Sequence, residues 1–176
     1  MKNFCITLIL ICIISLTVAV GIKSDTTSAE YLRIHIRANS NSVEDQSVKY
    51  EIKDILVSYL TPYIAECESK QEAENLLNEK RTKLNSLIDG LLKEKGFSYT
   101  SNVVVRNEKF PTRVYGEFTL DEGFYDAVIV ELGKANGDNW WCVVYPPLCF
   151  TSNACGVKYK SKILEIIKEF KEKTSA

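Results

Sequence analysis

The 176-residue sequence has a single histidine, His35, and none of the short motifs that mark common enzymes. It lacks a G-x-S-x-G nucleophile turn, an H-E-x-x-H zinc motif, a phosphate-binding P-loop and a G-x-G-x-x-G after a strand. The last three cysteines are spaced C-x6-C-x5-C, which is not the short paired spacing of a zinc site. We therefore expect no catalytic residues, no metal and no cofactor, and a protein that is not an enzyme.

Positive charge is not concentrated in any part of the sequence. There are 22 Lys and Arg residues against 23 Asp and Glu residues, which gives a formal net charge of −1. Nucleic-acid-binding proteins carry a basic patch or stripe, because contacts with phosphates dominate their affinity. We expect no nucleic-acid partner.

The longest stretch without charge is at the N-terminus. An apolar run from Phe4 to Ile22 is preceded by Lys2 and closed by Lys23. This layout is typical of a secretory signal peptide or an uncleaved signal anchor, and the run is just long enough to span a bilayer. We expect residues 1–23 to direct export and to contact the membrane. The pattern leaves open whether the protein is then released or stays tethered.

The pattern that follows predicts a strand and two helices at the start of one domain over residues 29–150. Residues 31–38 (YLRIHIRA) alternate as a half-buried strand, with Leu32, Ile34, Ile36 and Ala38 on one face and Arg33, His35 and Arg37 on the solvated face. Asn41 or Ser42 can cap the first helix, which Pro62 should end or kink near Thr61. The second helix is predicted from about Lys70 to Lys95, with Gly96 as its C-terminal stop.

Four strands are expected in the second half of the domain, in YTSNVVVRNE, TRVYGEFTL, YDAVIVELG and NWWCVVYP. The short turn segments between them favour an antiparallel meander. Residues 151–176 are expected to form a linker and an amphipathic helix, which would either pack on the domain or meet a partner or a membrane surface. The expected fold is a two-layer α+β domain with a mostly antiparallel sheet and helices on one face, in the order β-α-α-β-β-β-β plus a C-terminal helix.

The segment WWCVVYPPLCF, residues 140–150, holds both tryptophans and two prolines. As a strand it places Trp141 and Tyr145 on one face and Trp140 on the other, and Pro146 and Pro147 then turn the chain. A disulfide between Cys142 and Cys149 would close this corner and contribute about 2.5 kcal/mol. Two readings stay open: a rigid apolar surface for a partner, or ordinary tryptophan packing beside two free thiols.

A second group of polar residues gathers where the first strand meets the first helix. It comprises His35, Arg37, Asn39, Ser40 and Asp45. His35 with Asp45 and a serine could form a general-base arrangement. The same residues could form a docking surface, or they could simply cap the helix and support the turn.

Three blocks of sequence, RIHIRANSNSVEDQSVK, FPTRVYGEFTL and GDNWWCVVYPPLCF, carry a family resemblance. On these blocks residues 31–150 resemble the stage II sporulation protein R family of endospore-forming bacteria. A glycine-rich loop of that family corresponds to Gly133-Lys-Ala-Asn-Gly137 here, with one glycine replaced.

The resemblance implies a signalling protein that the forespore secretes into the space between forespore and mother cell. There it would activate a membrane-embedded aspartic protease of the mother cell, which processes a sporulation sigma-factor precursor. The resemblance does not say which residues contact the protease. We expect one contact at Trp141, Tyr145, Pro146 and Pro147, because aromatic side chains dominate interface energies, and another at His35, Arg37, Asn39, Ser40 and Asp45. The alternative function is a secreted cell-wall glycan binder or hydrolase.

Overall fold

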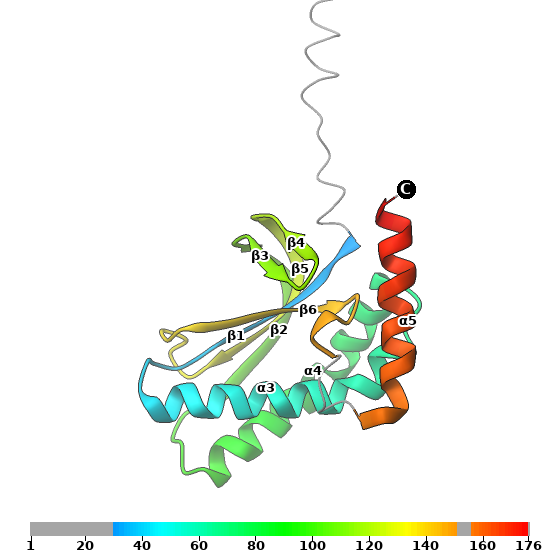
Figure 1. The fold of residues 1–176 in the computed structure, drawn as a ribbon. Coiled ribbons are helices and arrows are strands. Elements are labelled where there is room, and N and C mark those ends of the chain that lie inside the picture. The colour runs from blue at the N-terminus through cyan, green and yellow to red at the C-terminus, as the bar shows by residue number, and fades with distance from the viewer. Residues whose placement is uncertain (1–29, 151–155, 176) are drawn as a thin grey trace, which may run out of the picture.

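A computed structural model of the protein describes residues 30–150 and 156–175, and within the C-terminal helix it describes the side chains of residues 161–174 (Figure 1). The expected export segment and Cys155 lie outside the described residues. No helix in the described part of the sequence is long and apolar enough to cross a membrane.

The described residues form an α+β fold with a C-terminal helix, which confirms the predicted fold class. In sequence order the elements are β1 (Leu32–Arg37), α3 (Val43–Ile64), α4 (Lys70–Glu94), β2 (Ser101–Phe110), β3 (Arg113–Tyr115), β4 (Phe118–Leu120), β5 (Gly123–Leu132), β6 (Asn139–Tyr145), the 3-10 turn η1 (Leu148–Phe150) and α5 (Gly156–Ser175).

The main sheet has the strand order β2-β5-β1-β6. Strand β1 is parallel to β5 and antiparallel to β6, and β2 is antiparallel to β5. The expected meander is therefore wrong, because β1 lies between β5 and β6. Neighbouring strands are about 4.8 Å apart, so the loop 133–138 is long enough to pass over one strand. A short connection thus did not require β5 and β6 to be neighbours.

The segment TRVYGEFTL is a hairpin, and the prediction of one strand there is wrong. Strands β3 and β4 pair only with each other, as a separate two-stranded sheet. The backbone reverses at Gly116, whose φ of 62° lies in the left-handed region that glycine adopts without strain. The hairpin lies on the face of the main sheet that is turned away from α3 (Figure 1).

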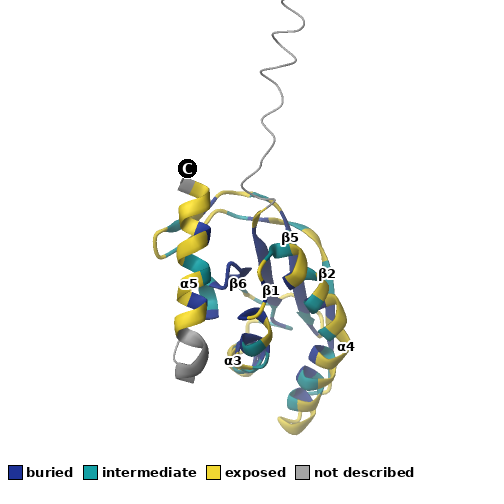
Figure 2. Cartoon of the chain, turned by 90° about the vertical axis from the view of Figure 1, so that its right-hand side faces the viewer, coloured by how far each residue is buried: buried dark blue, intermediate teal, exposed yellow. Residues whose placement is uncertain are grey.

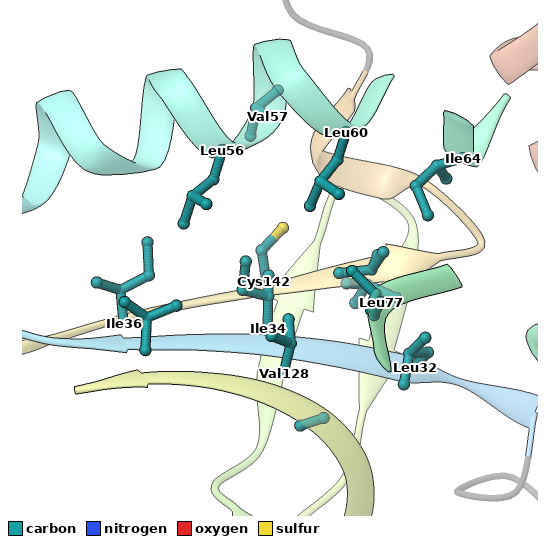
Figure 3. Packing of buried hydrophobic residues seen from close by; sticks show 14 of the residues in the cluster. Leu32, Ile34, Ile36, Leu56, Val57, Leu60, Ile64, Leu77, Val128 and Cys142 are labelled. Carbon is teal, nitrogen blue, oxygen red and sulfur yellow. The ribbon is translucent and has the colours of Figure 1, made fainter. Parts of the chain in front are cut away.

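The main core lies between the sheet and helices α3 and α4. Leu56, Leu60 and Ile64 of α3 face Ile34 and Ile36 of β1, as Figure 3 shows, and all five are at most 2% exposed. The outer faces of α3 and α4 are exposed (Figure 2). Both helices are therefore amphipathic and bury the stripe that faces the sheet.

The helix ends follow the sequence signals closely. Ser42 caps α3 by accepting a hydrogen bond from the Asp45 backbone N–H at 3.1 Å. Helix α4 ends with Gly96 at φ 80°, and the N–H of Phe97 bonds the carbonyl of Leu92 at 2.9 Å. This is the Schellman ending that a glycine favours. Helix α3 continues through Pro62 to Ile64, so the predicted end near Thr61 is wrong. The proline removes one backbone hydrogen bond, and the burial of Leu60 and Ile64 against the sheet holds the last turn in place.

Helix α5 packs against the domain, which was one of the two alternatives for the C-terminal segment. Ile163 is fully buried and Phe170 is 7% exposed, with its ring centroid 5.0 Å from that of Tyr31. An ion pair between Lys162 and Glu66, 2.7 Å apart, adds a surface contact. The helix stands beside η1 and the hairpin at one end of the sheet (Figure 1).

The loop 133–138 is bonded to the segment that leaves β1. The N–H of Gly137 donates to the carbonyl of Ala38 at 2.8 Å, and the N–H of Asn136 donates to the carbonyl of Asn39 at 3.2 Å. A Cβ on Gly137 would lie 2.2 Å from the backbone oxygen of Ser40. The loop and the β1–α3 junction therefore approach so closely that only glycine fits.

We predict that Gly137→Ala destabilises the protein by about 1–3 kcal/mol, because backbone must move to admit the methyl group. The matched change Gly90→Ala, on α4 with no atom within 4 Å of the new Cβ, should stabilise it by about 0.5–1 kcal/mol. Urea unfolding curves of the two variants and the parent measure both changes. Equal midpoints for Gly137→Ala and the parent would show that the close approach is absent.

Candidate functional site

Arg33, His35 and Arg37 share one face of β1, as predicted, but the face is not solvated. Arg33 is 0% exposed and His35 is 1% exposed. Aromatic side chains from β2, β3, β5 and β6 cover them: Phe110, Tyr115, Tyr125 and Trp141. The alternation of the strand could not reveal this cover, because the covering residues are distant in sequence.

Arg33 carries its charge into an aromatic enclosure. Its Cζ lies 4.3 Å from the ring centroid of Phe110 and 4.8 Å from that of Tyr125. Its Nη2 donates to the Tyr115 hydroxyl at 2.7 Å. Burial lowers the pKa of Arg33 from its ordinary value, and the nearby tyrosines oppose that shift. Cation–π contacts of this kind stabilise a cation where water is excluded.

His35 is held between a ring and a carboxylate. Its imidazole stacks on Trp141 with ring centroids 3.5 Å apart, and its Nδ1 lies 2.9 Å from Oε1 of Glu108. Burial lowers the pKa of His35, and the neighbouring Arg37 lowers it further, while Glu108 opposes both. At neutral pH the imidazole is therefore uncharged, with its Nδ1–H donating to the carboxylate.

Glu108 and Glu131 bind the arginines beside His35. Glu108 accepts from Arg37 at 2.5 Å and from Arg106 at 2.8 Å, and Glu131 accepts from the same arginines at 3.0 and 2.9 Å. Burial alone would raise the pKa of Glu108, but the bonds from Arg106 and His35 outweigh it and the pKa lies below its usual value. The alternation of β2 puts residues 106 and 108 on one face, and this is the one sequence pattern that indicates that Arg106 and Glu108 lie side by side.

Asp45 is the centre of a second cluster, at the junction of β1 and α3. Its carboxylate accepts from Ser40 Oγ at 2.5 Å, from Asn39 Nδ2 at 2.8 Å and from the Tyr99 hydroxyl at 2.5 Å. Burial would raise the pKa of Asp45, but the bonds from Ser40, Tyr99 and Asn39 lower it below its ordinary value. The cluster ties β1, α3 and the start of β2 together. Sequence reasoning missed Tyr99, which is 54 residues from Asp45.

The two clusters are separate, so the proposed general-base arrangement of His35 with Asp45 and a serine is not formed. His35 bonds Glu108, whereas Asp45 bonds Ser40, Asn39 and Tyr99. The physical reason is the β-strand period of two, which turns His35 toward the hairpin face, while Asp45 belongs to a helix on the other face.

A β-bulge separates Trp141 from Tyr145. Trp141 pairs with His35, but the register shifts so that Tyr145 pairs with Leu32 on the helix side of the sheet. The prediction that Trp141 and Tyr145 share a face is therefore wrong, because a bulge adds one residue and reverses the alternation beyond it. Tyr145, Pro146 and Pro147 are buried, and Trp141 is half-buried.

Cys142 and Cys149 are paired as a disulfide with their Cα atoms 6.2 Å apart. The bond joins β6 to η1 around the Pro146–Pro147 corner, as the sequence suggested. Cys67 is a free, buried thiol whose pKa burial raises to about 11. That thiol is therefore protonated and poorly reactive at neutral pH. Within the described residues no group of three or more His, Cys, Asp or Glu side chains is placed to hold a metal ion.

Comparison with known sequences identifies one family. A sequence model of the family described as Stage II sporulation protein R matches residues 28–154. The chain is similar to the stage II sporulation protein R of Bacillus subtilis (strain 168), with 31% identity over 131 residues, which is 74% of this chain and 58% of that protein. The match thus spans less than two thirds of that relative's length. No solved structure matches this chain.

We predict that Asp45→Asn destabilises the protein at pH 7 by about 2–3 kcal/mol, because three charge-assisted hydrogen bonds are weakened. The native pKa of Asp45 is lowered, so its contribution is present above the unfolded pKa of about 3.9 and is lost as the pH falls through the native pKa. Chemical unfolding from pH 7 down to pH 3 should show the difference between parent and variant shrinking below about pH 4.

The control is Asp54→Asn on the same helix, where the side chain is 61% exposed and the effect should stay within about 0.5 kcal/mol. If Asp45→Asn costs no more than this control, the carboxylate does not hold the junction together.

Proposed function

We propose, because this chain belongs to the stage II sporulation protein R family, that it is an extracytoplasmic signal which activates a membrane-embedded aspartic protease. The family itself establishes a role in sporulation. In the proposed mechanism the forespore secretes the protein into the space between forespore and mother cell. The protease, on the mother-cell side, then processes a sigma-factor precursor.

The observation that carries the proposal is the extent of the family match, residues 28–154, which takes in the whole described sheet, the hairpin and the disulfide corner. The geometry agrees with a binding role. The acidic side chains of both clusters are fully occupied in holding arginines, His35 and the β1–α3 junction. Such bonds make a rigid surface, and a pre-organised surface loses less entropy when a partner binds.

Only those residues of the two predicted contacts that are exposed to solvent can touch the protease directly. Trp141 and Arg37 are partly exposed, whereas Tyr145, Pro146 and Pro147 are buried and can act only by shaping the corner. The hairpin adds two exposed residues: Val114 is 67% exposed, and the Cζ of Arg113 lies 5.8 Å from the Trp141 ring centroid. We place the protease contact on the surface of Arg37, Arg113, Val114 and Trp141, and call it the hairpin surface.

The pair of tryptophans does not support glycan binding, the alternative function. Paired tryptophans that stack on a sugar must lie on one face, but Trp140 pairs with Ile36 and Trp141 with His35, on opposite faces of the sheet. Retention on purified peptidoglycan that disappears in Trp141→Ala would restore this alternative.

The proposal is tested by producing three proteins together in a bacterium that does not sporulate: this protein, the membrane protease and the sigma-factor precursor. We expect the precursor to be cleaved on immunoblots only when this protein is present with its residues 1–23. Deletion of those residues should abolish cleavage by keeping the protein inside the cell. An intact precursor with all three proteins present would contradict the proposal.

Within that assay, we predict that Val114→Glu reduces precursor cleavage tenfold or more, because a carboxylate covered by the partner loses its hydration, and a loss of about 1.4 kcal/mol weakens binding tenfold. The matched control is Val43→Glu at the start of α3, where the side chain is 81% exposed and lies away from the hairpin. Both variants should keep the thermal stability of the parent. Full activity of Val114→Glu and of a folded Trp141→Ala would remove the hairpin surface as the contact.

A further inference from the structure

Three buried side-chain nitrogens among the described residues lack a hydrogen bond of ordinary geometry: Nε and Nη1 of Arg33 and Nε2 of His35, although the Asn139 side chain lies close enough to His35 to raise its pKa. They come from one face of one strand, two residues apart. The other buried side-chain nitrogens and oxygens of the described residues are satisfied. The unsatisfied groups are thus gathered at one place, between β1 and the β3–β4 hairpin.

The aromatic enclosure does not replace the missing partners. The rings of Phe110 and Tyr125 stabilise the positive charge of Arg33, but the N–H bonds of a guanidinium lie in its own plane and need acceptor atoms there. The Tyr115 hydroxyl accepts from Nη2 only. Leaving buried donors of a charged group without acceptors is costly, so a ligand that supplies acceptors binds with a large gain.

No carboxylate among the described residues reaches Arg33. The groups that influence it electrostatically are Tyr115, Tyr125 and the cation Arg113. Glu108, on β2, which β5 separates from β1, is already bonded to His35, Arg37 and Arg106. The enclosure is therefore a cationic site with aromatic walls and without an anion of its own.

The cover over Arg33 is a small element. Strands β3 and β4 have three residues each and pair only with each other. The base of the hairpin is closed by the Thr112 hydroxyl, which accepts from the Glu122 N–H at 2.9 Å, and its tip is held to α5 by an exposed ion pair between Glu117 and Lys171. Lifting the hairpin would cost the packing of Leu120, Tyr115 and Phe118 against the core, but it would break no hydrogen bond of the main sheet, so it costs less than opening that sheet.

We propose that Arg33 is the binding residue of a covered carboxylate site, and that a protein partner inserts an acidic side chain or its own C-terminus beneath the β3–β4 hairpin. A carboxylate is favoured because it is small, planar and matches the guanidinium fork. The larger, doubly charged phosphate would need more cations than the single guanidinium inside the enclosure. The inference rests on the proposed docking function, and it adds the chemistry that the partner presents at the hairpin surface.

The test follows the Nε–H signal of Arg33 by nuclear magnetic resonance, using the full-length protein labelled with 15N-arginine in detergent micelles. Acetyl-glutamate amide supplies the carboxylate of an acidic side chain, and acetyl-alanine supplies a C-terminal carboxylate. Acetyl-glutamine amide has nearly the same shape as the first probe but no charge. The Nε–H signal of the exposed Arg81 on α4 is the control within the same spectrum.

We expect at least one carboxylate to shift the Arg33 signal in a saturable way at millimolar concentration, and the stronger of the two identifies the source. The glutamine probe should leave the signal unchanged, and Arg81 should not respond. No saturable shift at Arg33 with either carboxylate, or an equal shift at Arg81, would overturn the proposal. Arg33→Lys assigns the signal by its loss, and Tyr115→Phe assigns it by displacement if Arg33→Lys does not fold.

Two variants test the cover. Glu117→Gln removes the ion pair at the hairpin tip and should tighten carboxylate binding about twofold, because an open hairpin becomes less costly. Glu122→Gln removes a similarly exposed ion pair, with Lys109, that joins the ends of β2 and β5 and does not hold the hairpin tip, so it should leave binding unchanged. If Glu117→Gln weakens binding, the hairpin does not cover the site. These measurements use the isolated protein, so their failure would leave the cleavage assay and the proposed protease activation standing.

Discussion

The structure depends on the insertion of β1 between β5 and β6. Strand β1 has a hydrogen-bonded neighbour along each edge, and both of its faces are covered as well, by α3 on one side and by aromatic side chains on the other. It therefore buries a polar face as well as an apolar one. Its apolar face, with Ile34 and Ile36, forms the floor of the core beneath α3. Its other face carries a guanidinium and an imidazole into an environment where charge is costly. The aromatic enclosure of Arg33, the stacking of Trp141 on His35 and the position of Glu108 all follow from that demand.

A second constraint keeps β1 in place at its C-terminal end. The close approach of Gly137 to Ser40 and the bonds from Ser40, Asn39 and Tyr99 to Asp45 fix the path from β1 into α3. Strand β6, which pairs with β1, is held in turn by the disulfide between Cys142 and Cys149, at the opposite end of β1. With both ends held, a displacement of the hairpin need not disturb the sheet. This is the condition under which a small cover can move while its floor stays rigid.

Local signals in the sequence predicted the elements well. The Ser42 cap, the glycine stop at residue 96, the alternation of β1 and the disulfide pairing are all present, because each depends on residues close in sequence. What failed depends on distant residues. The order of strands, the bulge that moves Tyr145 to the helix side and the cover over Arg33 are set by tertiary packing, which spacing alone does not reveal. The polar patch was correctly placed around β1, but the strand period divided it into two clusters, one on each side of the sheet.

The division of the patch gives the two clusters different physical roles. Both carboxylate oxygens of Asp45 accept hydrogen bonds from within the protein, so that cluster stabilises the fold and offers little to a partner. Around Arg33 the balance is reversed, since a charge is buried without an acid and the element above it is a short hairpin. Natural folds keep such an unfavourable arrangement mainly where it serves binding. An acidic group from outside would relieve it, and the free energy released would oppose the cost of lifting the hairpin. Binding at this place would therefore change the surface that the protein presents, without any change in the sheet that supports it.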